Sequence, residues 1–187
     1  TCDDTAVIAR AFKDNPYEID IMAAGTAMRF MTAYLSVTEG EHVLTGTERM
    51  KQRPIKILVD ALRSLGADIQ YVGEEGFPPL RIKGKRLTGG SIEVAGNVSS
   101  QYVSALLMIG PTLEKGLELK LLGNVISRPY IDLTLNVMHE YGADAEWTDI
   151  DTITIRPKRY EERSYTIEND WTSASYWYAI LTLLNDR

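Results

Sequence analysis

Three strand-to-helix turns carry small and hydroxyl residues of the kind that bind anions. Gly25-Thr26 and Ser99-Ser100 each stand where a short apolar strand runs into an apolar helix, and Ser173 stands at a third such turn. The first turn of a helix has free backbone N–H groups and a partial positive charge, so these turns could hold a phosphate or a carboxylate. Ordinary N-capping by Ser and Thr is the better explanation of any single turn, and repeated caps are expected in a repeated fold.

The segment TERMKQRPI, residues 47–55, places three cations ahead of a predicted helix. Arg49, Lys51 and Arg53 would oppose the positive end of that helix dipole, which is unfavourable unless an anion is bound. A solvated run of charges is the comparable alternative. The segment therefore indicates an anion site, provided that the small-residue turns lie close to it.

The segment VISRPYI, residues 125–131, is the same element one period later. Ser127, Arg128 and Tyr130 together could hold an anionic, hydroxylated ring, with Arg and Ser on a phosphate and Tyr against the ring face. The two segments shift the balance from simple helix capping toward anion binding.

Composition limits the classes of protein that this chain can belong to. Its 187 residues are 44% apolar and 25% charged, enough for a folded core, and the net charge of −6 argues against non-specific binding to nucleic acid or anionic membranes. The single Cys2 can form neither an internal disulfide nor a structural zinc site, so we expect a cytoplasmic protein. No apolar run reaches the roughly 18 residues of a membrane helix. His42 and His139 are expected to be surface or structural histidines rather than ligands or bases.

A repeat with a period of 74–76 residues organises the chain. EIDIMAAGTAMRFMTAYL, SIEVAGNVSSQYVSALLM and SYTIENDWTSASYWYAIL align with Gly25, Ser99 and Ser173 spaced by 74 residues. RPIKILVDALRSLGADIQY likewise aligns with RPYIDLTLNVMHEYGADAEW. In these, proline is expected at the first helical position and glycine just past the last turn.

The repeated segments predict two kinds of helix. Helix 55–65 has one apolar stripe and should be half-exposed, whereas helices 26–37, 100–109 and 173–184 are apolar nearly all round and should be buried. Strands such as residues 80–83 alternate and should have one wet face. The repeating unit reads strand, amphipathic helix, strand, strand, strand, buried helix, which predicts an α/β (α+β) fold with helices inside and mixed sheets outside.

Five motifs in this chain resemble those of 5-enolpyruvylshikimate-3-phosphate synthases. AGTAMR, RMKQRPI, GNVSSQY, SRPYID and DWTSASYW occur in the order typical of that family and cover nearly the whole chain. The related UDP-N-acetylglucosamine enolpyruvyl transferases share the repeat, but their reactive-cysteine loop is not apparent here. Two alternatives to a 5-enolpyruvylshikimate-3-phosphate synthase therefore stay open. One is a UDP-N-acetylglucosamine enolpyruvyl transferase, and the other is a non-catalytic anion-binding repeat module.

The resemblance implies a role for individual residues. Shikimate 3-phosphate would be bound by Ser99, Ser100, Gln101, Ser127 and Tyr130, with the serines on the phosphate and Tyr130 against the ring. Phosphoenolpyruvate would be bound by Gly25, Arg53 and Gln101, with Thr26 and Arg29 in support. Gly25 matches the glycine where glyphosate competes, and Phe30 departs from the proline that many members carry there, which puts the setting of that helix in doubt.

The resemblance also implies a fold and a reaction. Members have two domains of three βαβαββ units each, so residues 1–168 should form most of one substrate-binding domain, with about two repeats and a partial one. Residues 169–187 should hold the crossover, near 168–172, and the first helix of a second domain. The reaction transfers the enolpyruvyl group to the 5-hydroxyl of shikimate 3-phosphate without metal or cofactor.

Because the acid–base groups of the family lie in other segments, we expect this internal fragment to contain no catalytic residue and to show no turnover. Neither nucleic acid nor a membrane is an expected partner. The intact enzyme is expected to be a monomer, and the fragment to dock helix 173–184 on the rest of the chain or to self-associate through it.

Overall fold

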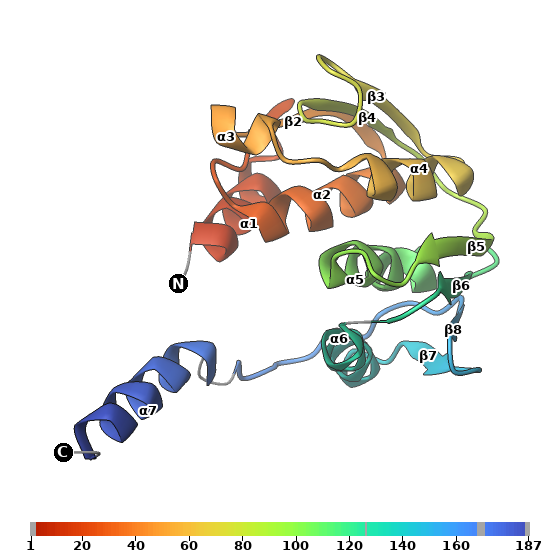
Figure 1. Ribbon diagram of the computed structural model, residues 1–187. Helices are drawn as coiled ribbons and strands as arrows, with labels where there is room; N and C mark the ends of the chain where they lie inside the picture. Colours follow the sequence, from red (N-terminus) through yellow and green to blue (C-terminus); the bar gives the residue numbers. More distant parts are fainter. Residues whose placement is uncertain (1–2, 126, 168–170, 186–187) are drawn as a thin grey trace.

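Two consecutive units, each a strand–helix–strand–helix–strand–strand run, make up the computed structural model, which describes residues 3–125, 127–167 and 171–185 (Figure 1). The first unit contains β1 (Glu18–Asp20), α2 (Gly25–Val37), β2 (Gly40–Thr45), α3 (Glu48–Lys51), α4 (Lys56–Ser64), β3 (Asp68–Tyr71) and β4 (Leu80–Gly84). The second contains β5 (Gly90–Ala95), α5 (Ser100–Ile109), the 3-10 turn η1 (Gly110–Thr112), β6 (Leu117–Leu122), α6 (Arg128–Glu140), β7 (Asp144–Trp147) and β8 (Thr152–Arg156). Helices α1 (Asp3–Asp14) and α7 (Trp171–Asn185) flank the two units.

The two sheets have the same topology. Their strand orders are β1-β2-β4-β3 and β5-β6-β8-β7, and in each the first pair is parallel and the other pairs are antiparallel. A parallel pair needs a crossover connection, and α2 and α5 provide it. The predicted fold class, the repeat and the order of elements within it are confirmed.

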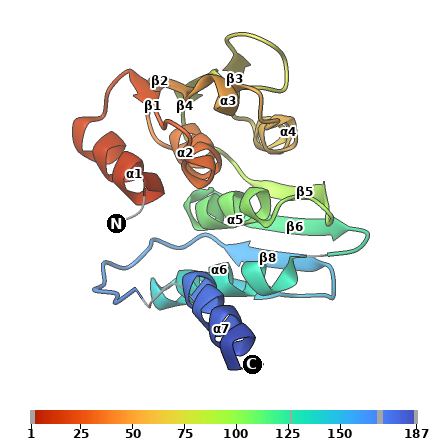
Figure 2. The same cartoon turned by 60° about the vertical axis from the view of Figure 1, so that its left-hand side comes forward.

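Helices α2 and α5 form the inside of the molecule. They pack against each other and lie side by side in Figure 2. Met28, Met31, Leu106 and Leu107 are buried within them, at 2% exposure or less. Strand β6 alternates buried and exposed positions, as expected for a sheet with one face on the core and one in solvent. The predicted arrangement, with helices inside and sheets outside, is therefore confirmed for these two units.

The predicted helix ends differ little from those observed. Gly66 and Gly142, just beyond α4 and α6, have φ of +97° and +82°, values that favour glycine after a helix. The expectation for proline holds only in the second unit. Pro129 lies in the first turn of α6, whereas Pro54 precedes α4, whose N-cap is Ile55.

Helix α1 was not expected from the sequence. It packs against α2, and its buried residues Val7 and Ala11 lie one helical turn apart on that side. The pair Phe12 and Tyr34 joins the same two helices, with ring centroids 4.9 Å apart in an edge-on arrangement. Helix α1 therefore extends the first unit on the N-terminal side.

Helix α7 forms as predicted, but the expectation that it is buried on all sides, or docked on the rest of the chain, is wrong. Tyr176, Trp177 and Leu183 are each about 70% exposed, and Figure 1 shows α7 projecting from the two units. An all-round apolar helix needs a covering surface, and the described residues do not provide one. The expected crossover at 168–172 falls partly on residues outside the described ranges, as does Cys2.

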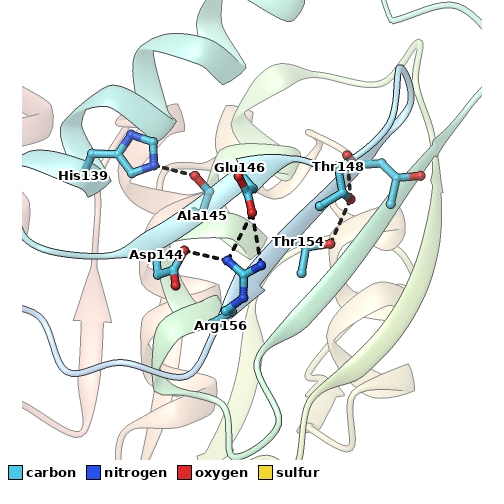
Figure 3. A network of polar contacts seen from close by, with 8 residues as sticks. His139, Asp144, Ala145, Glu146, Thr148, Thr154 and Arg156 are labelled. Atoms are coloured by element: carbon cyan, nitrogen blue, oxygen red, sulfur yellow. Dashed lines mark hydrogen bonds and ion pairs between the residues drawn. The ribbon is translucent and has the colours of Figure 1, made fainter.

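The outer face of the second sheet carries a polar network in which one arginine pairs with two carboxylates (Figure 3). Arg156 on β8 donates to Asp144 at 2.8 Å and to Glu146 at 3.1 Å, both on the neighbouring strand β7. The hydroxyls of Thr148 and Thr154 lie 2.9 Å apart beside it. This network shows how the fold pairs an arginine with carboxylates on a wet face.

Both histidines contact backbone carbonyls, in agreement with the expected surface or structural roles. His42 is buried, and its Nδ1 lies 2.9 Å from the carbonyl of Pro16. The Nε2 of His139 contacts the carbonyl of Ala145 (Figure 3). Within the described ranges, no helix is long and apolar enough to cross a membrane.

Candidate functional site

The start of α2 lies directly beneath the guanidinium of Arg53. A Cβ built on Gly25 would lie 3.1 Å from both Cζ and Nη2 of Arg53, and closer still to Nη1, so a side chain there would displace the guanidinium. The N-cap residue, Ala24, makes no side-chain hydrogen bond to the helix start, and the first turn of α2 contains no acidic residue. The free N–H groups of α2 and the charge of Arg53 therefore lie at the same place.

Arg29 places a second guanidinium one turn along α2. Its side chain is 5% exposed, and its Nη1 donates to the carbonyl of Gly25 at 3.0 Å. Its guanidinium carbon lies 5.7 Å from the ring centroid of Tyr102, and its Nε is buried without a hydrogen-bond partner. Arg29 is thus a buried cation that has no acidic partner in the described part of the chain.

The charges of this cluster repel one another. Partial burial and then the charge of Arg29 lower the pKa of Arg53, and Arg49 acts in the same direction. The attraction of Asp4 is the weakest of these influences. Neither Arg53 nor Arg49 forms an ion pair with any residue that the structure describes. An anion bound between them would relieve the repulsion.

A small cavity opens beside this cluster. It has a volume of about 160 Å³ and is lined by Ala23, Thr47, Arg49, Met50 and Arg53. Two of its five lining residues are arginines, so the cavity suits a small anion. Among the described residues, no group of His, Cys, Asp and Glu could hold a metal ion.

The start of α5 reaches across from the second unit to the first. The amide of Gln101 donates to Thr26 Oγ1 at 3.1 Å, and the hydroxyl of Tyr102 donates to the carbonyl of Pro54 at 2.6 Å. Ser99 caps α5, because its Oγ accepts from the backbone N–H of Gln101 at 3.3 Å. The structure therefore brings Gln101 to the helix start that carries Gly25, and it also shows the capping role that the sequence allowed for Ser99.

Ser99, Ser100 and Ser127 lie at one edge of the second sheet. Strands β5 and β6 are parallel, so the helices that follow them both begin at the carboxyl edge. The two turns touch, since a Cβ on Gly96 would lie 3.1 Å from the carbonyl oxygen of Asn124. Ser127 is the N-cap of α6 but makes no side-chain cap, so its hydroxyl is not engaged with its own helix.

Tyr130 and Arg128 are less closely associated with the cluster. The ring of Tyr130 is 64% exposed at the start of α6, and none of its described contacts joins it to Arg53. Arg128 faces elsewhere, because its Nη1 donates to the carbonyl of Ile150 at 2.8 Å and its guanidinium lies 3.8 Å from the ring centroid of Trp147. These partners turn the Arg128 guanidinium toward the following hairpin, and the interpretation that Arg128 holds a phosphate stays a prediction without support from its contacts.

Sequence reasoning missed the part that Tyr102 plays here. It assigned Tyr102 to the apolar face of a buried helix, and the residue is indeed 8% exposed. A phenol in a helix that is buried along most of its length needs a partner for its hydroxyl, and that requirement was the available signal. The structure supplies the partner 48 residues away, at Pro54.

Known proteins share both the sequence and the fold. The family profile described as EPSP synthase (3-phosphoshikimate 1-carboxyvinyltransferase) matches residues 3–186. A protein of Bacteroides fragilis named 3-phosphoshikimate 1-carboxyvinyltransferase is 60% identical over 182 residues, which cover 97% of this chain and 44% of that protein. One of the same name from Colwellia psychrerythraea is 43% identical over 166 residues, covering 88% and 39%. This chain thus spans less than half the length of these relatives.

Solved structures of known proteins have a similar fold. The EPSP synthase of Acinetobacter baumannii superposes with a TM-score of 0.66 at 26% identity, over 77% of this chain and 31% of that one. The enolpyruvyl transferase NikO of Streptomyces tendae, at 19% identity and a TM-score of 0.53, shares the fold, over 72% of this chain and 30% of that one. From its motifs, its repeated units and the match over residues 3–186, the chain belongs to the EPSP synthase family.

Proposed function

We propose that this chain supplies substrate-binding residues to a 3-phosphoshikimate 1-carboxyvinyltransferase, which moves the enolpyruvyl group of phosphoenolpyruvate onto the 5-hydroxyl of shikimate 3-phosphate. The observation that carries the proposal is the arginine cluster at the start of α2. There, Arg53 lies over Gly25 and beside the buried Arg29, with no carboxylate paired to either among the described residues. Membership of the family supports the choice of ligands.

Phosphoenolpyruvate is assigned to the turn of the first unit. Arg53 would bind its anionic groups, and Gly25 would leave room for the ligand because it has no side chain. Gln101 reaches the same turn through Thr26. Arg29 would stabilise that turn, because its guanidinium donates a hydrogen bond to the carbonyl of Gly25. In this assignment the cluster provides orientation and charge, which bring two anionic substrates together against their mutual repulsion.

Shikimate 3-phosphate is assigned to the edge of the second sheet. Ser99, Ser100 and Ser127 would bind its phosphate, where the starts of α5 and α6 offer N–H groups and partial positive charge. Gln101 lies between this edge and the turn of the first unit, so it can serve both substrates. The exposed ring of Tyr130 is free to lie against the shikimate ring.

The chemistry is an addition followed by an elimination. The 5-hydroxyl gives up its proton as its oxygen adds to C2 of phosphoenolpyruvate and C3 gains a proton. Phosphate then leaves as C3 loses a proton, and the enol ether remains. We assign no acid–base group to these 187 residues, and we assign 169–187 to the crossover and first helix of a second domain. The chain by itself should therefore bind substrate without turnover. Steady product formation by the purified chain would contradict this.

Calorimetric titration of shikimate 3-phosphate tests the binding assignment. The wild-type chain should bind it weakly, and Ser100→Ala should bind it several-fold more weakly. Ser91→Ala is the matched control, because Ser91 lies on β5 with its hydroxyl on Glu118, away from the helix starts. No heat with wild type, or equal heat with Ser100→Ala, would refute the assignment. Inorganic phosphate bound as tightly as shikimate 3-phosphate would instead indicate an anion-binding module.

Self-association through α7 is a further part of the proposal for this chain alone, whereas the intact enzyme should be a monomer located in the cytoplasm. Its exposed apolar residues would be covered in a dimer. Light scattering should show a dimer that Leu181→Lys dissociates. Ile150→Lys, at a 78% exposed site away from α7, should leave the dimer intact. A wild-type chain that stays monomeric at all concentrations would exclude the dimer.

A further inference from the structure

We infer that Tyr102 is a positioning residue that holds Arg53 over Gly25, an inference that rests on the proposed function for its choice of ligands. The Tyr102 hydroxyl donates to the carbonyl of Pro54 at 2.6 Å, and Pro54 is the residue next to Arg53. Tyr102 belongs to the second unit and Arg53 to the first. The hydrogen bond therefore crosses between units and reaches the backbone beside the arginine.

The loop restrains the backbone of Arg53 through the bond from its N–H to the carbonyl of Met50 at 3.0 Å, but that bond does not fix the side chain. Arg53 lies between the end of α3 at Lys51 and the start of α4 at Lys56, and its guanidinium makes no hydrogen bond to any described residue. Arg29 and Arg49 both repel it. A flexible arginine in that field would move away from Gly25, yet its guanidinium lies in contact with that residue. The hydrogen bond from Tyr102 to the carbonyl of Pro54 adds a second restraint on the backbone beside Arg53, from outside the loop.

Two consecutive residues of α5 bond to the two segments that meet at the start of α2, and the contacts form a closed loop. Gln101 donates to Thr26, next to Gly25, while Tyr102 donates to Pro54, next to Arg53. The contact between Gly25 and Arg53 completes this closed loop of contacts. One end of α5 thus bonds to the neighbours of both Gly25 and Arg53, so α5 and the loop that carries Arg53 together set the separation of these two residues.

Tyr102→Phe tests the hydroxyl alone, because it keeps the ring that lies beside Arg29. Tyr160→Phe is a matched control. The Tyr160 hydroxyl also donates to a backbone carbonyl, that of Met108 at 2.9 Å, but near the opposite end of α5. Both variants lose one tyrosine-to-carbonyl hydrogen bond, so a purely structural role predicts similar effects of the two on the melting temperature and none on ligands.

Two measurements follow the inference directly. The dissociation constant for phosphoenolpyruvate should rise roughly three- to tenfold in Tyr102→Phe, the effect of one net hydrogen bond, and stay within twofold in Tyr160→Phe. Shikimate 3-phosphate affinity should change less than twofold in either. In the ligand-free chain, the Nε–Hε NMR signal of Arg53 should move toward that of a free arginine in Tyr102→Phe only.

The two readouts separate failure of this inference from failure of the proposed function. If wild type does not bind phosphoenolpyruvate, the proposed function fails, and the Arg53 signal alone decides the role of Tyr102. An Arg53 signal that is equally unchanged in both variants would overturn the inference. An Arg53→Ala background should abolish the effect of Tyr102→Phe on phosphoenolpyruvate. A persisting effect there would show that Tyr102 does not act through Arg53 and would also overturn it.

Discussion

Arg53 lies in the first of the two equivalent units and Arg156 in the second. Both carry a positive charge, but carboxylates pair with Arg156 and none of the described ones pairs with Arg53. Arg156 lies on the wet face of the second sheet between Asp144 and Glu146 (Figure 3). Hydrogen bonds to Glu146 and then to Asp144 raise its pKa. Burial and the charge of Arg29 lower the pKa of Arg53, which has no paired carboxylate among the described residues.

The difference does not come from a shortage of acidic residues. The chain has 26 Asp and Glu against 20 Lys and Arg, so carboxylates are available to pair with every cation. They lie on other helices, in loops and on sheet faces, and the first turn of α2 has no acidic residue. The charge of Arg156 is therefore paired with carboxylates, whereas the charge of Arg53 has no paired carboxylate among the described residues and lies beside free N–H groups. Unpaired charge of that kind is what an anionic ligand requires.

Removing each arginine should have opposite consequences. Arg53→Ala should weaken phosphoenolpyruvate binding roughly 10- to 100-fold, the range for losing hydrogen bonds to a charged group. Its melting temperature should be unchanged or higher, because the repulsion from Arg29 and Arg49 is relieved. Arg156→Ala should lower the melting temperature slightly and leave the dissociation constant within twofold. Calorimetric titration measures the phosphoenolpyruvate affinity of both variants, and thermal denaturation measures their melting temperatures. An equal loss of affinity in Arg53→Ala and Arg156→Ala would contradict the proposed difference between the two arginines.

Crowding Arg53 should have a smaller effect than removing it. In Gly25→Ala the new Cβ would overlap Arg53 Nη1, so the guanidinium must shift and phosphoenolpyruvate affinity should fall about tenfold, or 1.4 kcal/mol. Gly73→Ala is the matched control, since a Cβ there meets no atom within 4 Å. Titration of both variants decides the matter. Wild-type affinity in Gly25→Ala would mean that Arg53 does not act from its position over Gly25.

A bound anion should stabilise the Arg53 cluster and not the Arg156 network. Inorganic phosphate at five times its dissociation constant should add about 1 kcal/mol of stability, or about 2–4 °C in melting temperature. The comparison is with chloride at equal ionic strength, which leaves general screening the same. The rise should persist in Arg156→Ala and vanish in Arg53→Ala. A rise of equal size in both variants would place the anion elsewhere.

How much of this could be predicted from the sequence depends on the range of the interaction. Local signals worked well, because helix periodicity and the glycine after each amphipathic helix depend on neighbouring residues. The bounds 100–109 and the positive φ at Gly66 were both expected. The apolar helix pattern of 173–184 was also interpreted correctly as a helix. It did not reveal whether a covering surface is present, and α7 is exposed for that reason.

Pairings between distant residues were beyond the sequence. The motif around Arg53 indicated an anion site, but nothing local tells that Tyr102, 48 residues later, would reach Pro54. The same limit applies to Arg128, which resembles Arg53 in its motif but lies in different surroundings. A tryptophan and a carbonyl on the following hairpin engage its guanidinium, and such partners are set by tertiary packing.

The smallest expected effect concerns pH and lies at the opposite end of α5, where no arginine cluster is involved. Burial raises the pKa of Tyr160 to about 12 from its ordinary value near 10. A raised pKa means that the folded state favours the neutral phenol. Its contribution to stability is therefore complete below pH 10 and is lost as the pH rises from 10 toward 12. Because the ring is only partly buried, the loss should stay below about 1 kcal/mol.

Denaturant unfolding between pH 8 and pH 11.5 measures this contribution. Wild type and Arg53→Ala should lose stability along parallel curves above pH 10, since both retain Tyr160. Tyr160→Phe should lose less over the same interval, because it has no phenol to ionise on unfolding. If the three curves ran parallel, ionisation of Tyr160 would not be coupled to folding. If Arg53→Ala alone diverged, the alkaline sensitivity would instead belong to the arginine cluster, and the two ends of α5 would not be independent.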